Sequence, residues 1–335
     1  MDPKQPTFLG KIPKNPAKKY QKKHQKKYPP QTQPKKIYQK GQYIQIPLAV
    51  ANFNVLNHLH LNKYTKFQEN IDISIERYIY SIKIVLNYVN MFQIFAVSLS
   101  EVTLEYYTAF NSLLKSAIRK GNIKVFYDGK SLMTIFFKNP RIQVIKAEQV
   151  SMERDPQRDR LQIFNLQLLF QNKYYPLTYI NIHGYGLPEI REKYLYNTFI
   201  LIDELRHDQL INNDLLCTGD FNSDWDQVFK VLENVKNENY LIDVSLFENF
   251  QPTSYHRYIL DEHGQFNDKP SQLWYSKLDH LLFSQRFQVV NLSIVPNNFT
   301  YYEHPYQIID DIQYTGQWPS DHTLNIYNLF WSPGQ

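Results

Sequence analysis

The sequence has little of what several common architectures need. Its 335 residues include one cysteine, Cys217, which excludes a disulfide framework and the paired cysteines of many zinc sites. No stretch of 18 consecutive apolar residues occurs, so we expect no membrane span, and the first residues lack the apolar segment of a secretory signal. These absences predict an intracellular protein of the cytoplasm or the mitochondrion that is not secreted.

Acidic residues are almost missing from the first 40 positions. These positions hold 12 lysines, no arginine and one acid, Asp2, giving a net charge of +11, so the other 295 residues carry −6 of the total of +5. The same segment holds seven prolines and six glutamines and cannot bury enough apolar surface to fold by itself. We therefore divide the chain into a basic, Lys/Pro-rich extended tail, 1–44, and a folded domain, 45–335.

Paired lysines in the tail alternate with tyrosines. The paired positions are Lys18, Lys19, Lys22, Lys23, Lys26, Lys27, Lys35 and Lys36. Lysine suits phosphate contacts and tyrosine suits base stacking, so we expect the tail to bind RNA or the surface of a large ribonucleoprotein. A solvated tail without a specific partner and a targeting segment are the alternatives.

Apolar patterns in the rest of the chain predict helices and strands in irregular alternation. Helices are expected over 71–91, 103–119 and 188–206, where Gly121 stops the second and Pro188 opens the third. Strands are expected over 44–54, 92–99, 123–127, 132–138, 142–150, 161–170, 179–182, 215–218, 278–284, 289–295 and 323–330. This mixture favours a layered α/β sandwich over a regular doubly wound fold.

Polar side chains recur where the predicted apolar strands begin or end. The set is Asn54, Glu101, His183, Asp220, Asn222, Asp279, Asp321 and His322. Charged groups next to apolar runs are costly unless they are paired or bound to a metal. Because four of these residues are carboxylates, the set suits a hard cation such as Mg²⁺ better than zinc.

Each polar residue taken alone also has an ordinary structural explanation. Glu101 could lie at a helix start, and Asp279 could pair with Lys277. Asp220 and Asn222 could be turn residues before a helix that Asp224 caps. Only the whole set, in its order along the chain, argues for a functional site.

Six short blocks contain this set. In chain order they are Asn54-Val55-Leu56, Leu99-Ser100-Glu101-Val102, Asn181-Ile182-His183, Gly219-Asp220-Phe221-Asn222-Ser223, Leu278-Asp279-His280 and Pro319-Ser320-Asp321-His322. They resemble the endonuclease/exonuclease/phosphatase superfamily with its DNase I-like fold, and within it the deadenylase branch of nocturnin and the Angel proteins. The resemblance covers about residues 45–331 and implies a four-layer α/β sandwich, two mixed β-sheets flanked by helices, with the site where the loops of both sheets converge.

The resemblance also implies roles for the metal-side and water-side residues. Glu101 would ligate Mg²⁺ (or Mn²⁺), with Asn54 beside it and Asp321 as a further metal or supporting carboxylate. Asp220 would orient and deprotonate the attacking water, and Asn222 would hydrogen-bond the phosphate. The metal would polarise the phosphate and take up developing charge.

Two histidines complete the implied machinery. His322 would bind phosphate oxygens, aligned by Asp279, and His183 would stabilise the leaving oxygen. The sequence departs from the family pattern at Ser100, where glutamine is usual, and after His183, where Gly184-Tyr185-Gly186 suggests a flexible loop. A polar insertion, 261–264, is expected to form a loop over the site.

These residues lead to one main functional hypothesis and two alternatives. The main one is a Mg²⁺-dependent phosphodiesterase that hydrolyses RNA, including 3′ exonuclease action of the poly(A) type. The first alternative is a structural or retained-enzyme subunit of a large ribonucleoprotein such as a ribosome, bound through the basic tail. The second is a phosphatase or phosphodiesterase that acts on a small molecule.

Overall fold

The computed structural model describes residues 44–57, 71–151, 160–249, 251–257, 273–295, 320 and 322–333. All of these belong to one compact unit, Tyr43–Gln335. The predicted RNA-binding tail, the insertion at 261–264 and Asp321 lie outside the described residues.

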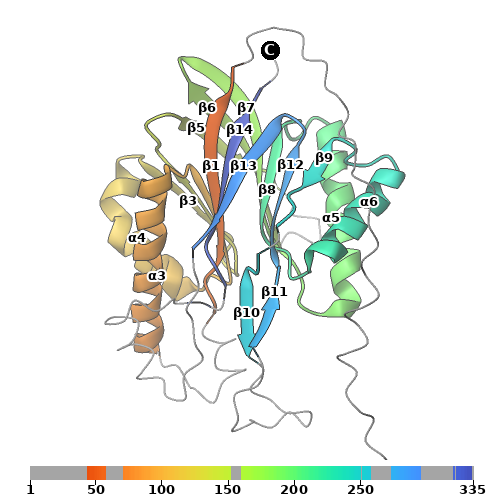
Figure 1. The fold of residues 1–335 in the computed structure, drawn as a ribbon. Coiled ribbons are helices and arrows are strands. Elements are labelled where there is room, and N and C mark those ends of the chain that lie inside the picture. Colours follow the sequence, from red (N-terminus) through yellow and green to blue (C-terminus); the bar gives the residue numbers. More distant parts are fainter. Residues whose placement is uncertain are drawn as a thin grey trace, which may run out of the picture. The chain divides into compact units, whose positions relative to one another are not determined.

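Two six-stranded sheets form the centre of this unit (Figure 1). The first sheet has the order β13-β14-β1-β2-β4-β3, in which only β1 and β2 are parallel neighbours. Its strands are β1 (Ile46–Asn54), β2 (Ala96–Ser100), β3 (Ile123–Tyr127), β4 (Met133–Phe137), β13 (Phe287–Ile294) and β14 (Asn325–Trp331).

The second sheet has the order β5-β6-β7-β8-β12-β9, with β7 and β8 as its parallel pair. Its strands are β5 (Gln143–Gln149), β6 (Leu161–Phe170), β7 (Lys173–His183), β8 (Leu215–Asp220), β9 (Val244–Leu246) and β12 (Asp279–Ser284). A separate antiparallel pair, β10 (Ser254–Arg257) and β11 (Leu273–Ser276), precedes β12 in the chain.

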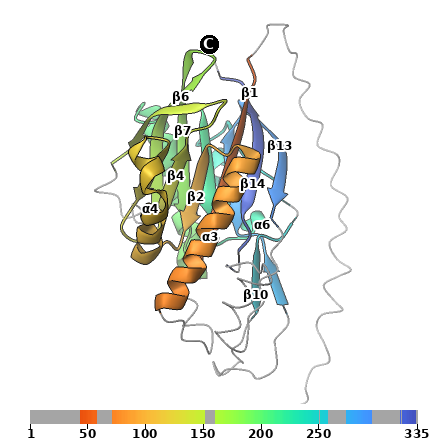
Figure 2. The same ribbon diagram turned by 90° about the vertical axis from the view of Figure 1, so that its left-hand side faces the viewer.

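In the described part of the chain, four helices cover the outer faces of the two sheets, and Figure 2 is a view onto the pair that covers the first sheet. On the first sheet lie α3 (Ile71–Phe92) and α4 (Leu104–Arg119), and on the second lie α5 (Pro188–His207) and α6 (Trp225–Asn237). The hydroxyl of Thr103 accepts the Tyr106 N–H at 3.2 Å and caps α4, and Pro188 occupies the first turn of α5, as the sequence predicts. The predicted four-layer sandwich, two mixed sheets flanked by helices, is confirmed.

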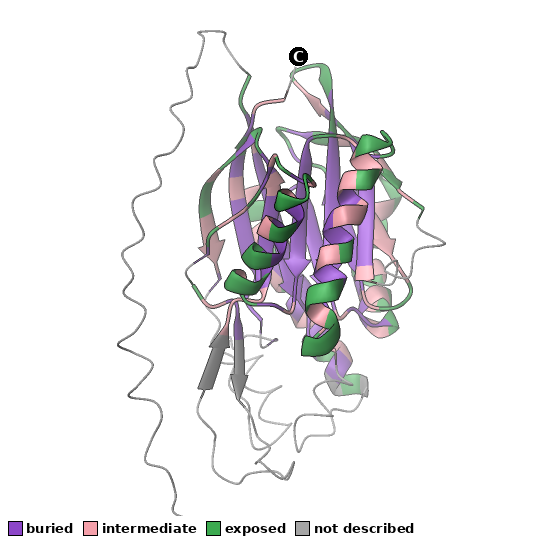
Figure 3. Ribbon diagram, turned by 90° about the vertical axis from the view of Figure 1, so that its right-hand side faces the viewer, coloured by how far each residue is buried: buried purple, intermediate pink, exposed green. Residues whose placement is uncertain are grey.

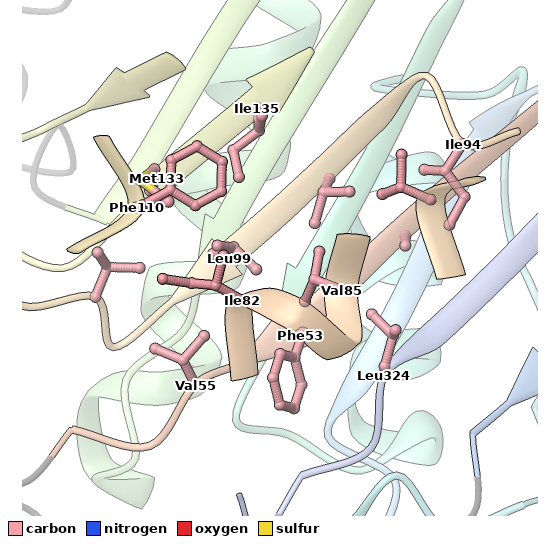
Figure 4. Packing of buried hydrophobic residues seen from close by; sticks show 14 of the residues in the cluster. Phe53, Val55, Ile82, Val85, Ile94, Leu99, Phe110, Met133, Ile135 and Leu324 are labelled. Atoms are coloured by element: carbon pink, nitrogen blue, oxygen red, sulfur yellow. The ribbon is translucent and has the colours of Figure 1, made fainter. Parts of the chain in front are cut away.

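Apolar residues fill the three spaces between the layers. In β1, Leu48 and Val50 face the second sheet, whereas Ala51 and Phe53 face the helices, because successive side chains of a strand point to opposite faces. The packing between the first sheet and its helices is seen in Figure 4, where Ile82 of α3 lies among residues of β1 and β2. Figure 3 shows the strands buried along most of their length and the outer helix faces exposed.

No helix in the described ranges has both the length and the apolar composition that a bilayer crossing requires.

Candidate active site

Polar residues occupy the last inward-facing positions of the strands at one end of the sandwich. In β1 the face toward the second sheet continues from Val50 to Asn52 and Asn54. In β8 it continues from Leu216 to Asp220. Ile46, Leu48 and Val50 make the rest of this face of β1 apolar, so the amides of β1 and the carboxylate of β8 meet at this end.

Three residues of the second sheet are direct neighbours across adjacent strands. The register places His183 of β7 opposite Asp220 of β8, and Asp279 of β12 opposite Asp220 on the other side. All three are at least 96% buried. The positions of these three backbones therefore follow from strand pairing alone.

Asn54 links the two sheets. Its Nδ2 donates to Glu101 Oε1 at 2.9 Å and to Asp220 Oδ2 at 3.0 Å, and it lies 3.5 Å from His322 Nε2. Glu101 directly follows β2 of the first sheet, and Asp220 ends β8 of the second. One amide thus sets the separation between the predicted metal ligand and the predicted base.

The turn after β1 orients both residues on the metal side. The Leu56 N–H donates to Asn54 Oδ1 at 2.9 Å, and the Asn57 N–H donates to Glu101 Oε2 at 3.0 Å. Leu56 and Glu101 both have φ of 58°, in the left-handed region that non-glycine residues rarely adopt. Strain of this kind persists where surrounding contacts hold it, commonly at functional sites.

Arg77 of α3 holds that turn through hydrogen bonds to its backbone. It is 2% exposed, and it donates from Nη1 to the Val55 carbonyl at 3.0 Å and from Nη2 to the Leu56 carbonyl at 2.8 Å. The peptide groups that accept from Arg77 are the same two whose N–H groups donate to Asn54 and Glu101. Hydrogen bonds in such a chain polarise one another, so the guanidinium strengthens the donors that hold the metal side.

Asp279 fixes the orientation of His322. Asp279 Oδ2 lies 2.9 Å from His322 Nδ1, and Oδ1 accepts from Asn52 Nδ2 at 2.7 Å. The hydroxyl of Thr253 accepts the backbone N–H groups of Leu278 and Asp279, each at 3.0 Å. The carboxylate of Asp279 therefore pairs with Asn52 and His322, and Nε2 of His322 is directed toward the site.

Two histidines approach one oxygen of Asp220. His322 Nε2 lies 3.8 Å and His183 Nε2 lies 4.0 Å from Asp220 Oδ2, while Oδ1 accepts the Asn222 N–H at 2.8 Å. Burial raises the pKa of Asp220 to about 6, although His322 opposes the shift and Asp279 adds to it. A carboxylate with such a pKa is a better base near neutral pH than an exposed aspartate.

The loop after His183 packs closely against the turn that holds Asn222. A Cβ on Gly184 would lie 2.0 Å from the Phe221 carbonyl oxygen, so glycine is required here by close approach of the two backbones. The Gly184 carbonyl accepts from Asn222 Nδ2 at 3.0 Å. In this arrangement the side-chain amide of Asn222 bonds to the loop.

His280 is adjacent to Asp279 in the sequence but does not belong to the site. It lies next to Asp279 but on the opposite face of β12, where its Nε2 donates to the Ser223 carbonyl at 2.7 Å. Burial lowers its pKa. Its contact supports the turn that follows Asp220.

The structure brings seven of the eight predicted site residues into one cluster: Asn54, Glu101, His183, Asp220, Asn222, Asp279 and His322. Their individual roles stay predictions. Asn52, Arg77 and Thr253, which position the others, were not predicted from the sequence. Asn52 could have been found from the period of two, since it shares a strand face with Asn54; Arg77 lies in a helix and gave no such signal.

The donor set of the metal side fits Mg²⁺. Among the described residues, no group of three or more His, Cys, Asp or Glu side chains is arranged to hold a metal. Mg²⁺ commonly takes one or two protein carboxylates and completes its shell with waters and phosphate oxygens. Glu101 meets that requirement through its carboxylate oxygens, and Asn54, whose Nδ2 donates to Glu101 Oε1 at 2.9 Å, lies beside it.

Comparison with known proteins identifies the fold. No protein-family model matches the sequence, and no curated protein matches it. Solved structures do match over most of the chain, and they define the class: the chain has the DNase I-like fold of endonuclease/exonuclease/phosphatase structures. The closer resemblance to nocturnin and the Angel proteins stays a prediction from the motifs.

Three of these structures show the range of relatives with this fold. An endonuclease/exonuclease/phosphatase family protein from Bacteroides thetaiotaomicron has a TM-score of 0.54 and 14% identity, over 86% of this chain and 99% of that one. D. rerio TDP2 complexed with a single-strand DNA product has a TM-score of 0.53 and 11% identity, over 84% of this chain and 98% of that one. A mannosyl-6-phosphatase from B. thetaiotaomicron has a TM-score of 0.53 and 14% identity, over 84% of this chain and 99% of that one.

Proposed function

We propose that the protein is a metal-dependent phosphodiesterase that hydrolyses RNA. The observation that carries this proposal is the single cluster in which Asn54 joins Glu101 to Asp220 while two histidines face the same Asp220 oxygen. A general base, an oxygen ligand for a cation and two donors for phosphate oxygens are the parts that phosphoryl-group hydrolysis needs. Asn54, Asp220 and both histidines are buried, which strengthens the interactions among them.

In the proposed reaction the protein groups act from two sides of the phosphate. Asp220 Oδ2 accepts a proton from the attacking water. His322, held by Asp279 in the tautomer with hydrogen on Nδ1, donates from Nε2 to a phosphate oxygen when it is protonated. His183 donates to the leaving oxygen.

Glu101 and Asn54 would hold Mg²⁺ or Mn²⁺ beside the same phosphate. A bound divalent cation polarises a phosphoryl oxygen and neutralises charge that develops in the transition state. Asn54 keeps Glu101 and Asp220 apart by donating to both, so each carboxylate retains its own task.

A substrate panel tests this function. Purified protein is assayed with Mg²⁺, Mn²⁺ or chelator on an oligoadenylate, a mixed RNA, single-stranded DNA and mannose 6-phosphate, with Asp220→Asn as the control for contaminants. We expect metal-dependent cleavage of RNA that the variant lacks. Hydrolysis of mannose 6-phosphate alone would support the small-molecule alternative, which has a specific basis because a mannosyl-6-phosphatase shares the fold.

The basic tail is proposed to carry the protein to RNA or to a large ribonucleoprotein. Its net charge of +11 favours phosphate contacts and the release of counterions. We predict that deleting residues 1–40 weakens binding to long RNA and flattens the salt dependence, with little change in turnover of a short substrate. Fluorescence anisotropy at several salt concentrations measures this.

Sedimentation of the full chain from its native source separates an enzyme from a particle subunit. A subunit co-sediments with RNA-rich particles at moderate salt, and truncation of residues 1–40 releases it while Asp220→Asn does not. Unchanged RNA affinity and sedimentation after truncation would leave a tail without a specific partner.

A further inference from the structure

Two arginines near the loop after His183 have no acidic partner in the described part of the chain, unlike Arg206 of α5. Arg206 donates from Nη1 and Nη2 to the carboxylate of Asp243 at 2.8 and 2.7 Å. By contrast, Arg160 and Arg191 bond only to neutral acceptors in the described part of the chain. Their positive charges are therefore not balanced by a described carboxylate.

Both arginines bind the loop 184–187, which follows His183. Arg160 Nη1 donates to the Gly184 carbonyl at 2.8 Å, and its guanidinium lies 4.3 Å from the centre of the Tyr185 ring. Arg191 Nη2 donates to the Gly186 carbonyl at 2.7 Å. The arginines thus approach the loop from two elements, the start of β6 and the first turn of α5.

The same loop is tied to the reaction centre. The Gly184 carbonyl also accepts from Asn222, whose backbone N–H donates to Asp220. Arg160 directly precedes Leu161, which pairs with Ile182 in antiparallel register, so Arg160 lies opposite His183. A folded domain with a net charge of −6 therefore presents two guanidinium groups on one side of its site.

The hydrogen-bonding capacity of Arg160 is largely unused. A guanidinium has five N–H donors, and in the described residues Arg160 bonds through Nη1 alone. Arginine binds phosphate through two nitrogens at once, and partial burial against Tyr185 strengthens such a pair because water is excluded from one side.

We propose that Arg160, Arg191 and the loop 184–187 form a subsite for a second phosphate, next to the one that is cleaved, on the leaving-group side. This rests on the proposed function and narrows it. The substrate is a chain with at least two phosphate groups, such as an oligonucleotide, and the leaving fragment carries the second phosphate. A sugar monophosphate does not use this subsite.

Three adenosine dinucleotides test the subsite. ApA has only the scissile phosphate, pApA adds one at the 5′ end and ApAp adds one at the 3′ end. We expect one of the two extended dinucleotides to exceed ApA in kcat/KM by about tenfold or more, the effect of one charge-assisted hydrogen bond. The one that gains shows which end of the chain leaves.

Arginine variants locate the effect. Arg160→Gln and Arg191→Gln should each reduce the advantage of the extended dinucleotide several-fold while ApA is cleaved at a similar rate. Arg286→Gln is the matched control, because it removes the same charge from a residue that pairs with Asp214 at 3.4 Å. Its preference should equal that of the wild type, and thermal melts confirm folding of all three variants.

Two results overturn the subsite and leave the phosphodiesterase intact. Equal kcat/KM for ApA, pApA and ApAp in the wild type shows that no second phosphate is bound. An equal loss on all three dinucleotides in Arg160→Gln and Arg191→Gln shows that the arginines only hold the loop. Absence of hydrolysis of any phosphodiester, including long RNA, instead overturns the proposed function and the subsite with it.

Discussion

The strands of the first sheet lead to two amides, one carboxylate and His322, whereas those of the second sheet lead to two carboxylates, His183 and Asn222. In the second sheet, His183, Asp220 and Asp279 are neighbours across three paired strands. In the first, Asn54 ends β1 but Glu101 follows β2, with its backbone in the left-handed region. Strand pairing therefore positions one half of the site, and side-chain contacts position the other.

This contrast predicts where the molecule tolerates change. Residues positioned by strand register keep their place when their side chains are replaced by isosteres, so variants there report chemistry. Residues of the first sheet depend on the hydrogen bonds around Leu56, Asn57 and Arg77. Variants there should alter metal binding before they alter folding.

The largest effect is expected at Asp220. Asp220→Asn keeps the shape of the side chain and removes the base, so hydrolysis should fall by about 10²-fold or more. Steady-state kinetics on the best RNA substrate measures this. Asp214→Asn is the matched control, because Asp214 is a buried aspartate that directly precedes β8 and accepts a hydrogen bond from Trp331. An equal loss of hydrolysis in this control would mean that destabilisation explains both results.

The next effect concerns the metal ligand of the first sheet. Glu101→Gln should weaken Mg²⁺ binding by at least about tenfold, because substitution of a residue that only orients a metal ligand already lowers metal affinity by that factor. Isothermal calorimetry compares it with Glu148→Gln, which removes an exposed carboxylate of β5. Equal affinity in the wild type and Glu101→Gln would contradict the assignment of Glu101.

Removing the support for the turn should act through the same ligand. Arg77→Lys keeps the charge but cannot donate to both the Val55 and Leu56 carbonyls in the same geometry, so Mg²⁺ affinity should drop about tenfold. The control is Arg206→Lys at the far end of α5, an arginine whose side chain is 9% exposed. A loss of stability without a change in Mg²⁺ affinity would show that Arg77 serves packing alone.

The smallest effect is a pH dependence set by the second sheet. Because the pKa of Asp220 is raised to about 6, kcat/KM should fall about tenfold between pH 7 and pH 5 as the base is protonated. The effect on stability has the opposite sign to that of an aspartate in an ion pair. As the pH rises from 3.8 to about 6, the unfolded state loses the Asp220 proton before the folded state does, so the free energy of unfolding falls. Asp220→Asn should lose both dependences, and an unchanged stability–pH curve in the variant would contradict the burial effect.

Much of the site could be predicted from the sequence because each functional residue sits at the end of an apolar strand. The apolar residues of β1 and β8 indicated strands. The polar residue at the end of each strand marked a position where a buried polar group must be paired or bound to a metal. The order of the six blocks added the fold. The predicted strand over 179–182 is shorter than β7, which begins at Lys173, because Pro176 interrupts the strand pattern of the sequence.

The types of chemical group, the layers and the strand ends at which the groups lie could be predicted from the amino-acid sequence, because these depend on periodicity and on local backbone preferences. Which of these groups meet depends on the tertiary structure. Asn54 contacts residues 47 and 166 positions away, and Asn52 reaches Asp279 across 227 positions. Such contacts depend on how two sheets are placed face to face, and that placement comes from packing of the whole core between them.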